Sequence, residues 1–378
     1  MKIFLIYDSK GNLGDNIRIT RIIRFLQKNR HDVIHFNLNE HYKKNKMSVF
    51  KPRLIAETLK NLINISDKKV FVNKIYQSYG RTMLSNTIKN ENPDIIICES
   101  PKLAAMCLKI NIGCKIILDV HGVGFLEYKE NKFIRKKSEK YIRYLDDIER
   151  TAFKDSDYLM VVSNNMKKYI TENFKIDPKK IIVVSNGADI QEKTAKYSDD
   201  IKVVYGGIFA FWEDIDSYLD LAKENNNAKF FLMGGGPMEK HLLKRIEKED
   251  IAIEFIGYLK KDKSLSKFAE MQIGIAPSTN NLTRYVACPI KVFDYMACGL
   301  PVITPDYGEW AKIVKKYDCG IVTKSSNGKE FNCAVKKLKN KDVWNKKSKN
   351  AIETIKKHYN WDALLKPLGK LLNELEKK

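Results

Sequence analysis

Residues 276–303 contain the most suggestive spacing of chemically active side chains, APSTNNLTRYVACPIKVFDYMACGLPVI. An apolar run leads into a polar loop, and a helical pattern follows between Pro289 and Gly299. Proline suits the first turn of a helix, and glycine suits the position after its last turn. A helix N-terminus attracts anions, and Lys291 adds a positive charge in the first turn. The segment therefore predicts a diphosphate site.

Lys291 and Asp294 lie three positions apart and share one face of this predicted helix. A carboxylate one turn in from a phosphate site is well placed to accept hydrogen bonds from ribose hydroxyls. An ordinary surface Lys–Asp pair on a capped helix is the alternative interpretation.

Two further segments could contribute chemistry. His121 closes the apolar run 115–120, at the carboxyl end of a predicted strand, where imidazoles commonly bind ligands or move protons. Gly11, Asn12 and Gly14 follow the first predicted strand, although a glycine pair in such a turn is by itself a weak signal.

The elements that position these residues alternate between short apolar strands and amphipathic helices. Near-continuous apolar strands of this kind predict parallel sheets covered on both faces, an α/β fold. A largely helical stretch is expected over residues 59–90. The expected strands are 2–7, 32–37, 93–98, 115–120, 158–163, 180–185, 202–205, 229–233, 253–256, 272–276, 301–304 and 320–323.

The strand–helix rhythm restarts near residue 195, after the polar stretch 191–200, which reads as a linker. A chain of 378 residues is also long enough for two domains. We expect a first domain over 1–190 and a second domain over 191–360. Residues 361–378 form a helix that packs back toward the first domain. The carboxyl ends of the strands would face a cleft between the domains.

The segment from Cys288 to Ile303 resembles the donor-binding segment of family 4 retaining glycosyltransferases, the "S-P-x-K-x-x-E-Y-M-A-x-G-x-P-V-I" pattern. Further similarities follow in family order: the glycine loop at 11–15, D-V-H-G at 119–122, G-G-G-P at 234–237 and F-I-G-Y-L at 255–259. The resemblance implies the GT-B fold, in which two Rossmann-like parallel-sheet domains face each other across a cleft. It also implies that residues 1–190 form the acceptor-side domain and residues 191–360 the nucleotide-sugar-binding domain.

The resemblance also implies roles for individual residues. Catalysis would involve His121, Lys291 and Asp294. The donor would be held by Gly11, Asn12, Gly14, Gly207, Tyr258, Leu259, Arg284, Pro289, Ile290, Lys291 and Asp294, with Tyr258 available to stack on the base.

Two departures from the family pattern concern the donor. The first Glu of the family's Glu-x7-Glu would fall at Val286, so that carboxylate is absent. The family's Arg and Lys after the first strand of the second domain are also absent from residues 205–214. Lys291 and Arg284 must then supply the positive charge for the diphosphate.

The implied activity is transfer of a hexose, with retention, from a nucleotide-diphosphate sugar to a lipid-linked or glycan acceptor. A helix N-terminus and Lys291 stabilise the leaving group without a metal ion. Two Asp-x-Asp triplets, at 155–157 and 214–216, have the positions of structural residues and not of metal ligands. We therefore expect no cofactor and no obligatory metal.

Composition restricts the remaining choices. The hydrophobic content of 44% excludes a disordered chain, and no apolar run approaches the length of a membrane-spanning helix. The seven cysteines form no Cys-x-x-Cys pair and read as free thiols in a reducing compartment. Together with the family resemblance, these features imply a cytoplasmic enzyme of cell-envelope glycan synthesis, peripheral on the inner face of the membrane.

The net charge of +22 admits nucleic acid, anionic lipid or phosphorylated molecules as partners. Residues 41–80 carry nine Lys or Arg against two Asp or Glu, on the acceptor-side domain. This favours a phosphate-bearing lipid or glycan acceptor at an anionic membrane surface. No nucleic-acid motif accompanies the basic runs. A nucleotide-sugar 2-epimerase, a nucleic-acid-binding protein and a catalytically silent relative stay as alternatives.

Overall fold

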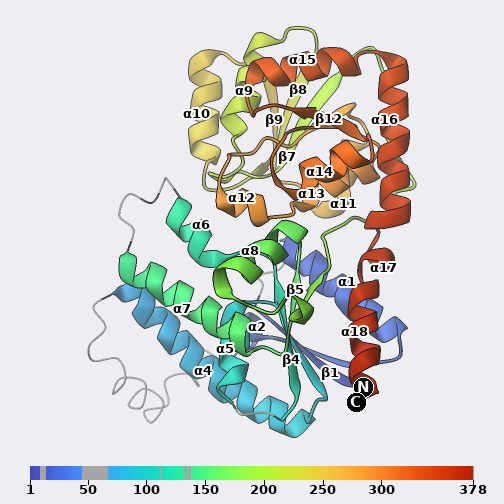
Figure 1. Ribbon diagram of the computed structural model, residues 1–378. Coiled ribbons are helices and arrows are strands. Elements are labelled where there is room, and N and C mark those ends of the chain that lie inside the picture. Colours follow the sequence, from blue (N-terminus) through green and yellow to red (C-terminus); the bar gives the residue numbers. More distant parts are fainter. Residues whose placement is uncertain (9–13, 45–66, 111–112, 132–133, 135–137, 378) are drawn as a thin grey trace. The chain divides into compact units, whose positions relative to one another are not determined.

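The computed structural model of the protein describes residues 1–8, 14–44, 67–110, 113–131, 134 and 138–377 (Figure 1). The chain forms two compact units. The N-terminal unit comprises Met1–Glu130, Ile134–Val184 and Leu365–Lys378, and the C-terminal unit comprises Ser185–Leu364 together with residues 131–133. Each unit is built around its own six-stranded sheet.

The sheet of the N-terminal unit is entirely parallel, in the order β2-β1-β3-β4-β5-β6. Its central strands are buried on both faces over most of their length, as their largely apolar sequences require. The strands are β1 Lys2–Tyr7, β2 Asp32–Asn37, β3 Ile95–Cys98, β4 Lys115–Val120, β5 Tyr158–Val161 and β6 Ile181–Val183.

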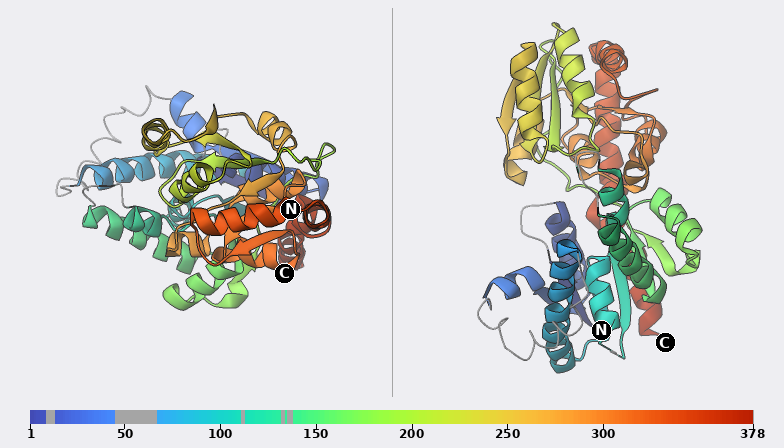
Figure 2. Two further views of the ribbon diagram at one scale, coloured as in Figure 1. Left: turned by 90° about the horizontal axis from the view of Figure 1, so that it is seen from above. Right: turned by 90° about the vertical axis from the view of Figure 1, so that its left-hand side faces the viewer.

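Helices cover both faces of this sheet (Figure 2). The long helix α4 begins at Asp67, whose carboxylate accepts hydrogen bonds from the backbone N–H groups of Lys69 and Val70. The helices are α1 Gly14–Lys28, α2 Leu38–Lys44, α4 Lys68–Glu91, α5 Pro101–Leu108, α6 Gly124–Glu130, α7 Glu139–Asp155 and α8 Asn164–Phe174, with a short 3₁₀ turn at Pro178–Lys180.

The last helix of the chain, α18 (Lys366–Glu376), belongs to the N-terminal unit. Its leucines Leu368, Leu371 and Leu372 are buried in one apolar cluster with residues of β1 and α1. The N-terminal amine of Met1 lies 3.5 Å from the Glu376 carboxylate, so both ends of the chain meet in this unit.

The sheet of the C-terminal unit is also entirely parallel, in the order β12-β11-β10-β7-β8-β9. The order reverses between β10 and β7, and ligands of such sheets bind beyond the carboxyl ends of the strands at this reversal. The strands are β7 Lys202–Ile208, β8 Lys229–Gly235, β9 Ile253–Gly257, β10 Ile273–Ile275, β11 Val302–Pro305 and β12 Gly320–Thr323.

The helices of the C-terminal unit also flank both faces of its sheet (Figure 2). They are α9 Ile215–Glu224, α10 Glu239–Glu249, α11 Lys261–Phe268, α12 Leu282–Val286, α13 Ile290–Ala297, α14 Gly308–Lys316, α15 Gly328–Leu338, α16 Lys341–Thr354 and α17 Trp361–Leu364, with a π-helical turn at Ile355–Tyr359.

All twelve predicted strands are present, and the predicted α/β class with parallel sheets is confirmed. Of the helical stretch expected over 59–90, residues 68–90 are helical, and 59–66 lie outside the described residues. Seven free cysteines are found, five of them buried. Among the described residues, the helices are all too short or too polar to cross a membrane.

Candidate functional site

The helix predicted at the centre of the candidate site is α13, and it has the expected boundaries. Pro289 precedes its first residue in an extended conformation, which fixes where the helix begins. Gly299 follows its end with φ of +77°, a left-handed conformation that side chains disfavour. Lys291 consequently stands in the first turn, where the N–H groups of the helix are unpaired.

The Lys291 side chain is buried and extends beneath the carboxyl end of β7. Its Nζ lies 2.5 Å from Oε2 of Glu213 and donates a hydrogen bond of 2.8 Å to the Tyr205 hydroxyl. Gly207 lies beside it, and a Cβ at that position would approach Lys291 Cε to 2.9 Å. The bare backbone of Gly207 is therefore what allows the ammonium group to reach this position.

Arg284, in the middle of the short helix α12, contacts the other oxygen of the same carboxylate. Its Nη1 lies 3.3 Å from Glu213 Oε1, and its Nε donates to Ser278 Oγ at 3.2 Å. The guanidinium carbon lies 4.6 Å from the centre of the Trp310 ring, a cation–π distance. Nη2 of Arg284 is buried without a hydrogen-bond partner among the described residues.

These three charged groups, which we call the Glu213 cluster, perturb one another strongly. Burial lowers the pKa of Lys291 to about 8, against the opposing charge of Glu213. Burial raises the pKa of Glu213, but the charges of Arg284 and Lys291 outweigh it, so the pKa of that carboxyl lies below its usual value. Two cations around one carboxylate leave a net positive charge, and an anion would balance it.

Asp294 does not pair with Lys291, so the alternative interpretation of these two residues as a surface Lys–Asp pair is wrong. Both side chains are buried, and Asp294 Oδ2 lies 2.5 Å from Nζ of Lys261 on α11. Burial raises the pKa of Asp294, and the Lys261 charge opposes that shift. The second oxygen, Oδ1, is buried without a partner among the described residues. Such an atom is suited to accept a ligand hydroxyl.

The remaining residues predicted to bind the donor differ in how exposed they are. Tyr258 follows β9 and is 59% exposed, as a ring available for stacking would be. Leu259 and Ile290 are half-buried, and the carbonyl of Leu259 accepts a hydrogen bond from Ser264. Gly14 begins α1, while Gly11 and Asn12 lie outside the described residues.

In the N-terminal unit, His121 follows β4 as predicted and is held by a buried ion pair. Its Nε2 lies 2.7 Å from Asp119 Oδ2, and Asp119 also accepts hydrogen bonds from Nε and Nη2 of Arg18 on α1. Burial raises the pKa of Asp119, but the charges of Arg18 and His121 lower it further, so the carboxyl stays ionised. The Asp119 carboxylate therefore orients the His121 ring.

Both Asp-x-Asp triplets are occupied by protein partners. Asp157 accepts hydrogen bonds from the Lys115 ammonium and the Ile116 backbone N–H at the amino ends of the strands. Asp216 pairs with Arg245 on α10, and Asp214 accepts a hydrogen bond from Ser217 at the start of α9. These contacts agree with the structural role predicted for the triplets.

Comparison with protein families decides what kind of protein carries this site. Residues 187–358 match the model described as glycosyl transferases group 1, and residues 57–192 match the model described as glycosyltransferase family 4. The chain belongs to the group 1 glycosyltransferases.

Two curated relatives are similar to this glycosyltransferase over most of its length. An uncharacterized glycosyltransferase of Methanocaldococcus jannaschii is 23% identical, over 69% of this chain and 68% of the relative. The chitobiosyldiphosphodolichol beta-mannosyltransferase of Kluyveromyces lactis is 24% identical, over 80% of this chain and 76% of the relative.

Solved structures agree on the fold of this glycosyltransferase. Sucrose-phosphate synthase from Thermosynechococcus elongatus superposes with a TM-score of 0.79 at 14% identity, covering 100% of this chain and 99% of that structure. Anabaena HepE in complex with UDP-glucose gives a TM-score of 0.72 at 14% identity, covering 99% and 100%. The predicted GT-B fold, with two Rossmann-like units, is confirmed.

The sequence interpretation missed Glu213, Tyr205 and Arg18 of this glycosyltransferase. Glu213 lies in the segment 205–214, where the family pattern has cations and not a carboxylate. A buried Lys needs a counterion, so an acidic residue shortly after the first strand of this unit was the available signal. For Arg18, the signal was its place on the apolar face of α1, one turn before Ile22.

Proposed function

We propose that this glycosyltransferase moves a hexose from a nucleotide-diphosphate sugar to a phosphate-bearing lipid or glycan acceptor, with retention and without an obligatory metal ion. The Glu213 cluster at the carboxyl end of β7 carries the proposal. It supplies buried positive charge where the first turn of α13 presents N–H groups. The leaving group of the proposed reaction is a dianionic diphosphate, which such a site stabilises.

Two of the buried polar atoms that lack a partner among the described residues of the C-terminal unit fit complementary parts of a nucleotide sugar. Nη2 of Arg284 is a donor and suits a phosphate oxygen. Oδ1 of Asp294 is an acceptor and suits a ribose hydroxyl. Lys261 keeps the Asp294 carboxylate in place through the other oxygen. In this scheme Tyr258 stacks on the base.

The proposed bond changes need no protein nucleophile. The bond between the anomeric carbon and the diphosphate oxygen breaks, and the acceptor oxygen bonds to that carbon on the same face. The acceptor proton passes to the departing phosphate oxygen. The best-placed carboxylates support this scheme, because Glu213, Asp294 and Asp119 are each paired with a cation and are weak nucleophiles. His121 orients the transferred sugar.

A lipid-linked acceptor is supported by the relatives and by charge. The yeast relatives are named for a chitobiosyl group on diphosphodolichol, a diphosphate-bearing lipid. The N-terminal half of this chain carries the larger share of the positive charge, with 35 basic against 21 acidic residues in 1–190 and 33 against 25 in 191–378. We place the enzyme on the cytoplasmic face of an anionic membrane, in cell-envelope glycan synthesis.

The first test measures the thermal denaturation of the full chain in the presence of each nucleotide sugar of a panel. The correct donor should raise the melting temperature more than its free nucleoside diphosphate does. Labelled donor is then incubated with polyisoprenyl diphosphate-linked sugars, with and without EDTA. We expect a glycoside with the donor's anomeric configuration by NMR, at an unchanged rate in EDTA. An isomerised nucleotide sugar without transfer would identify an epimerase instead.

A further inference from the structure

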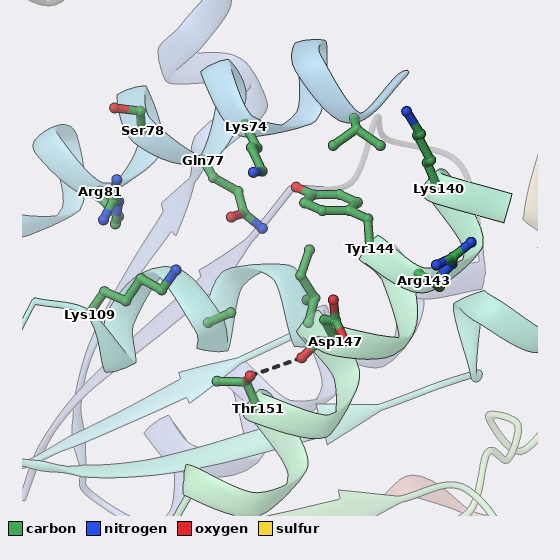
Figure 3. A pocket seen from close by; sticks show the side chains of 13 residues that line it. Lys74, Gln77, Ser78, Arg81, Lys109, Lys140, Arg143, Tyr144, Asp147 and Thr151 are labelled. Atoms are coloured by element: carbon green, nitrogen blue, oxygen red, sulfur yellow. Dashed lines mark hydrogen bonds between the residues drawn. The ribbon is translucent and has the colours of Figure 1, made fainter. Parts of the chain in front are cut away.

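A cavity of about 620 Å³ lies wholly within the N-terminal unit between α4, α5 and α7 (Figure 3). It lies among the outer helices and not at the carboxyl ends of the strands, so it is separate from both His121 and the Glu213 cluster. We call it the α4–α7 pocket. Its volume is typical of small-molecule sites and too small for a nucleic-acid duplex.

The charge of this pocket is strongly one-sided. Five cations line it, against the single carboxylate of Asp147; the cations are Lys74, Arg81, Lys109, Lys140 and Arg143. Arg143 has an acidic neighbour in Glu139, at 3.3 Å. Within the described part of the chain, no carboxylate lies within ion-pair distance of Lys74, Arg81 or Lys109. Packing alone does not gather like charges from three helices, because they repel one another.

Two buried polar groups in the wall also lack partners. Nε2 of Gln77 on α4 and the hydroxyl of Tyr144 on α7 make no hydrogen bond with any described residue. Figure 3 shows Lys74 and Gln77 reaching down from α4 toward Tyr144, while Lys109 rises from α5. Both groups can donate a hydrogen bond, so each is suited to an oxygen atom of a ligand in the pocket.

The floor of the pocket is apolar. Val70, Ala105 and Ile148 line it, and all three side chains are buried. The Tyr144 ring continues this surface toward Tyr141, whose ring stacks on it with centres 6.0 Å apart. A ligand with an anionic head and an apolar body would contact both the cations and the apolar floor of the pocket.

We propose that the α4–α7 pocket binds a phosphate or diphosphate group, preferentially one carried on an apolar chain. Phosphate oxygens accept hydrogen bonds from several donors at once, which matches the Gln77 amide, the Tyr144 hydroxyl and the surrounding ammonium and guanidinium groups. The pocket is a site additional to the donor site, and its existence does not depend on the proposed transfer reaction.

The test is lysine footprinting of the full-length protein, with mass spectrometry to measure acetylation at each site. Inorganic pyrophosphate represents the free anion, and farnesyl diphosphate represents the anion on an apolar chain. Both should protect Lys74 and Lys109, and farnesyl diphosphate should do so at roughly tenfold lower concentration because it also covers the apolar floor. Lys154, on α7 outside the pocket, serves as the unprotected internal control.

Variants separate this pocket from the donor site. A Lys74→Gln, Arg81→Gln double variant should weaken farnesyl diphosphate binding roughly 30-fold by calorimetry. Lys154→Gln is the matched surface control and should bind normally. Lys291→Met removes a charge of the donor cluster and should leave this binding intact.

The outcomes are distinct. Equal affinity for the two probes supports a site for a soluble phosphate anion. Protection of Lys154 along with Lys74 and Lys109, or unchanged binding by the double variant, overturns the proposal. Loss of binding in Lys291→Met alone overturns it too, because the anion would then occupy the donor site.

Discussion

The carboxylate of Glu213 and the ammonium group of Lys291 lie 2.5 Å apart, although 78 positions separate them in the chain. The pair is buried, and Arg284 approaches the second oxygen of the same carboxylate. The cations that face the proposed diphosphate are therefore held in place before the donor arrives. A site organised in this way spends little binding free energy on rearrangement.

Replacing Glu213 with Gln should destabilise the protein by about 3 kcal/mol, because two buried cations lose their counter-charge. A bound nucleoside diphosphate should restore more stability to this variant than to the native protein, since its phosphates supply the missing negative charge. Urea denaturation with and without ligand measures both effects. Glu254→Gln, at an exposed position of β9, is the control; an equal loss in the two variants contradicts the role of Glu213.

The alkaline limb of the pH–rate profile should report the deprotonation of the Lys291 ammonium group. Its pKa is lowered to about 8, so the ammonium form is lost as pH rises through that value. The donor then loses a cation, and kcat/KM for the donor should fall above about pH 8. Lys291→Arg keeps the charge and should show no such limb between pH 7 and 10. A limb that persists in this variant assigns the titration to another group.

Substitutions at His121 and Asp119 should affect different properties, the first the transfer rate and the second the free energy of unfolding. His121→Gln leaves the Arg18–Asp119 pair intact, so the free energy of unfolding should change by less than about 1 kcal/mol while the transfer rate falls roughly 100-fold. Asp119→Asn strips Arg18 of its buried counter-charge and should cost about 3–5 kcal/mol. Urea denaturation and initial rates measure the two effects. A stable Asp119→Asn protein would show that the pair does not hold β4 to α1.

Glu149 should make the free energy of unfolding fall as pH rises, which is the opposite of the usual effect of a carboxyl group. It is buried on α7, accepts the Gly124 backbone N–H at 2.6 Å, and burial raises its pKa to about 8. Between the ordinary value of 4.5 and about 8, the folded state keeps a proton that the unfolded state has released. Its contribution to the free energy of unfolding therefore falls as pH rises through that window.

Glu149→Gln should remove this dependence. The difference in unfolding free energy between variant and native protein should grow from pH 5 to pH 8 by a few kcal/mol at most, on the order that linkage allows. Glu139→Gln, an exposed residue of the same helix, provides the comparison. Parallel pH profiles for all three proteins would show that Glu149 titrates normally.

The sequence was sufficient for the architecture because its signals are local. Strand residues such as 95–98 are uniformly apolar, which requires burial on both faces and hence a parallel sheet. Pro289 and Gly299 mark the ends of α13 through their backbone preferences alone. The order of these patterns, with the Lys291 segment among them, was also sufficient to indicate the glycosyltransferase family.

The tertiary structure decided which charges meet. Whether Lys291 pairs with Asp294, three positions away, or with Glu213 in another loop depends on where the loop after β7 passes α13. The α4–α7 pocket arises in the same way, since its cations come from three helices that no sequence period relates. Backbone preferences act over a few neighbouring residues, and they define the elements. Electrostatic pairing acts through space, so it becomes fixed only when the sheets bring distant loops and helices together.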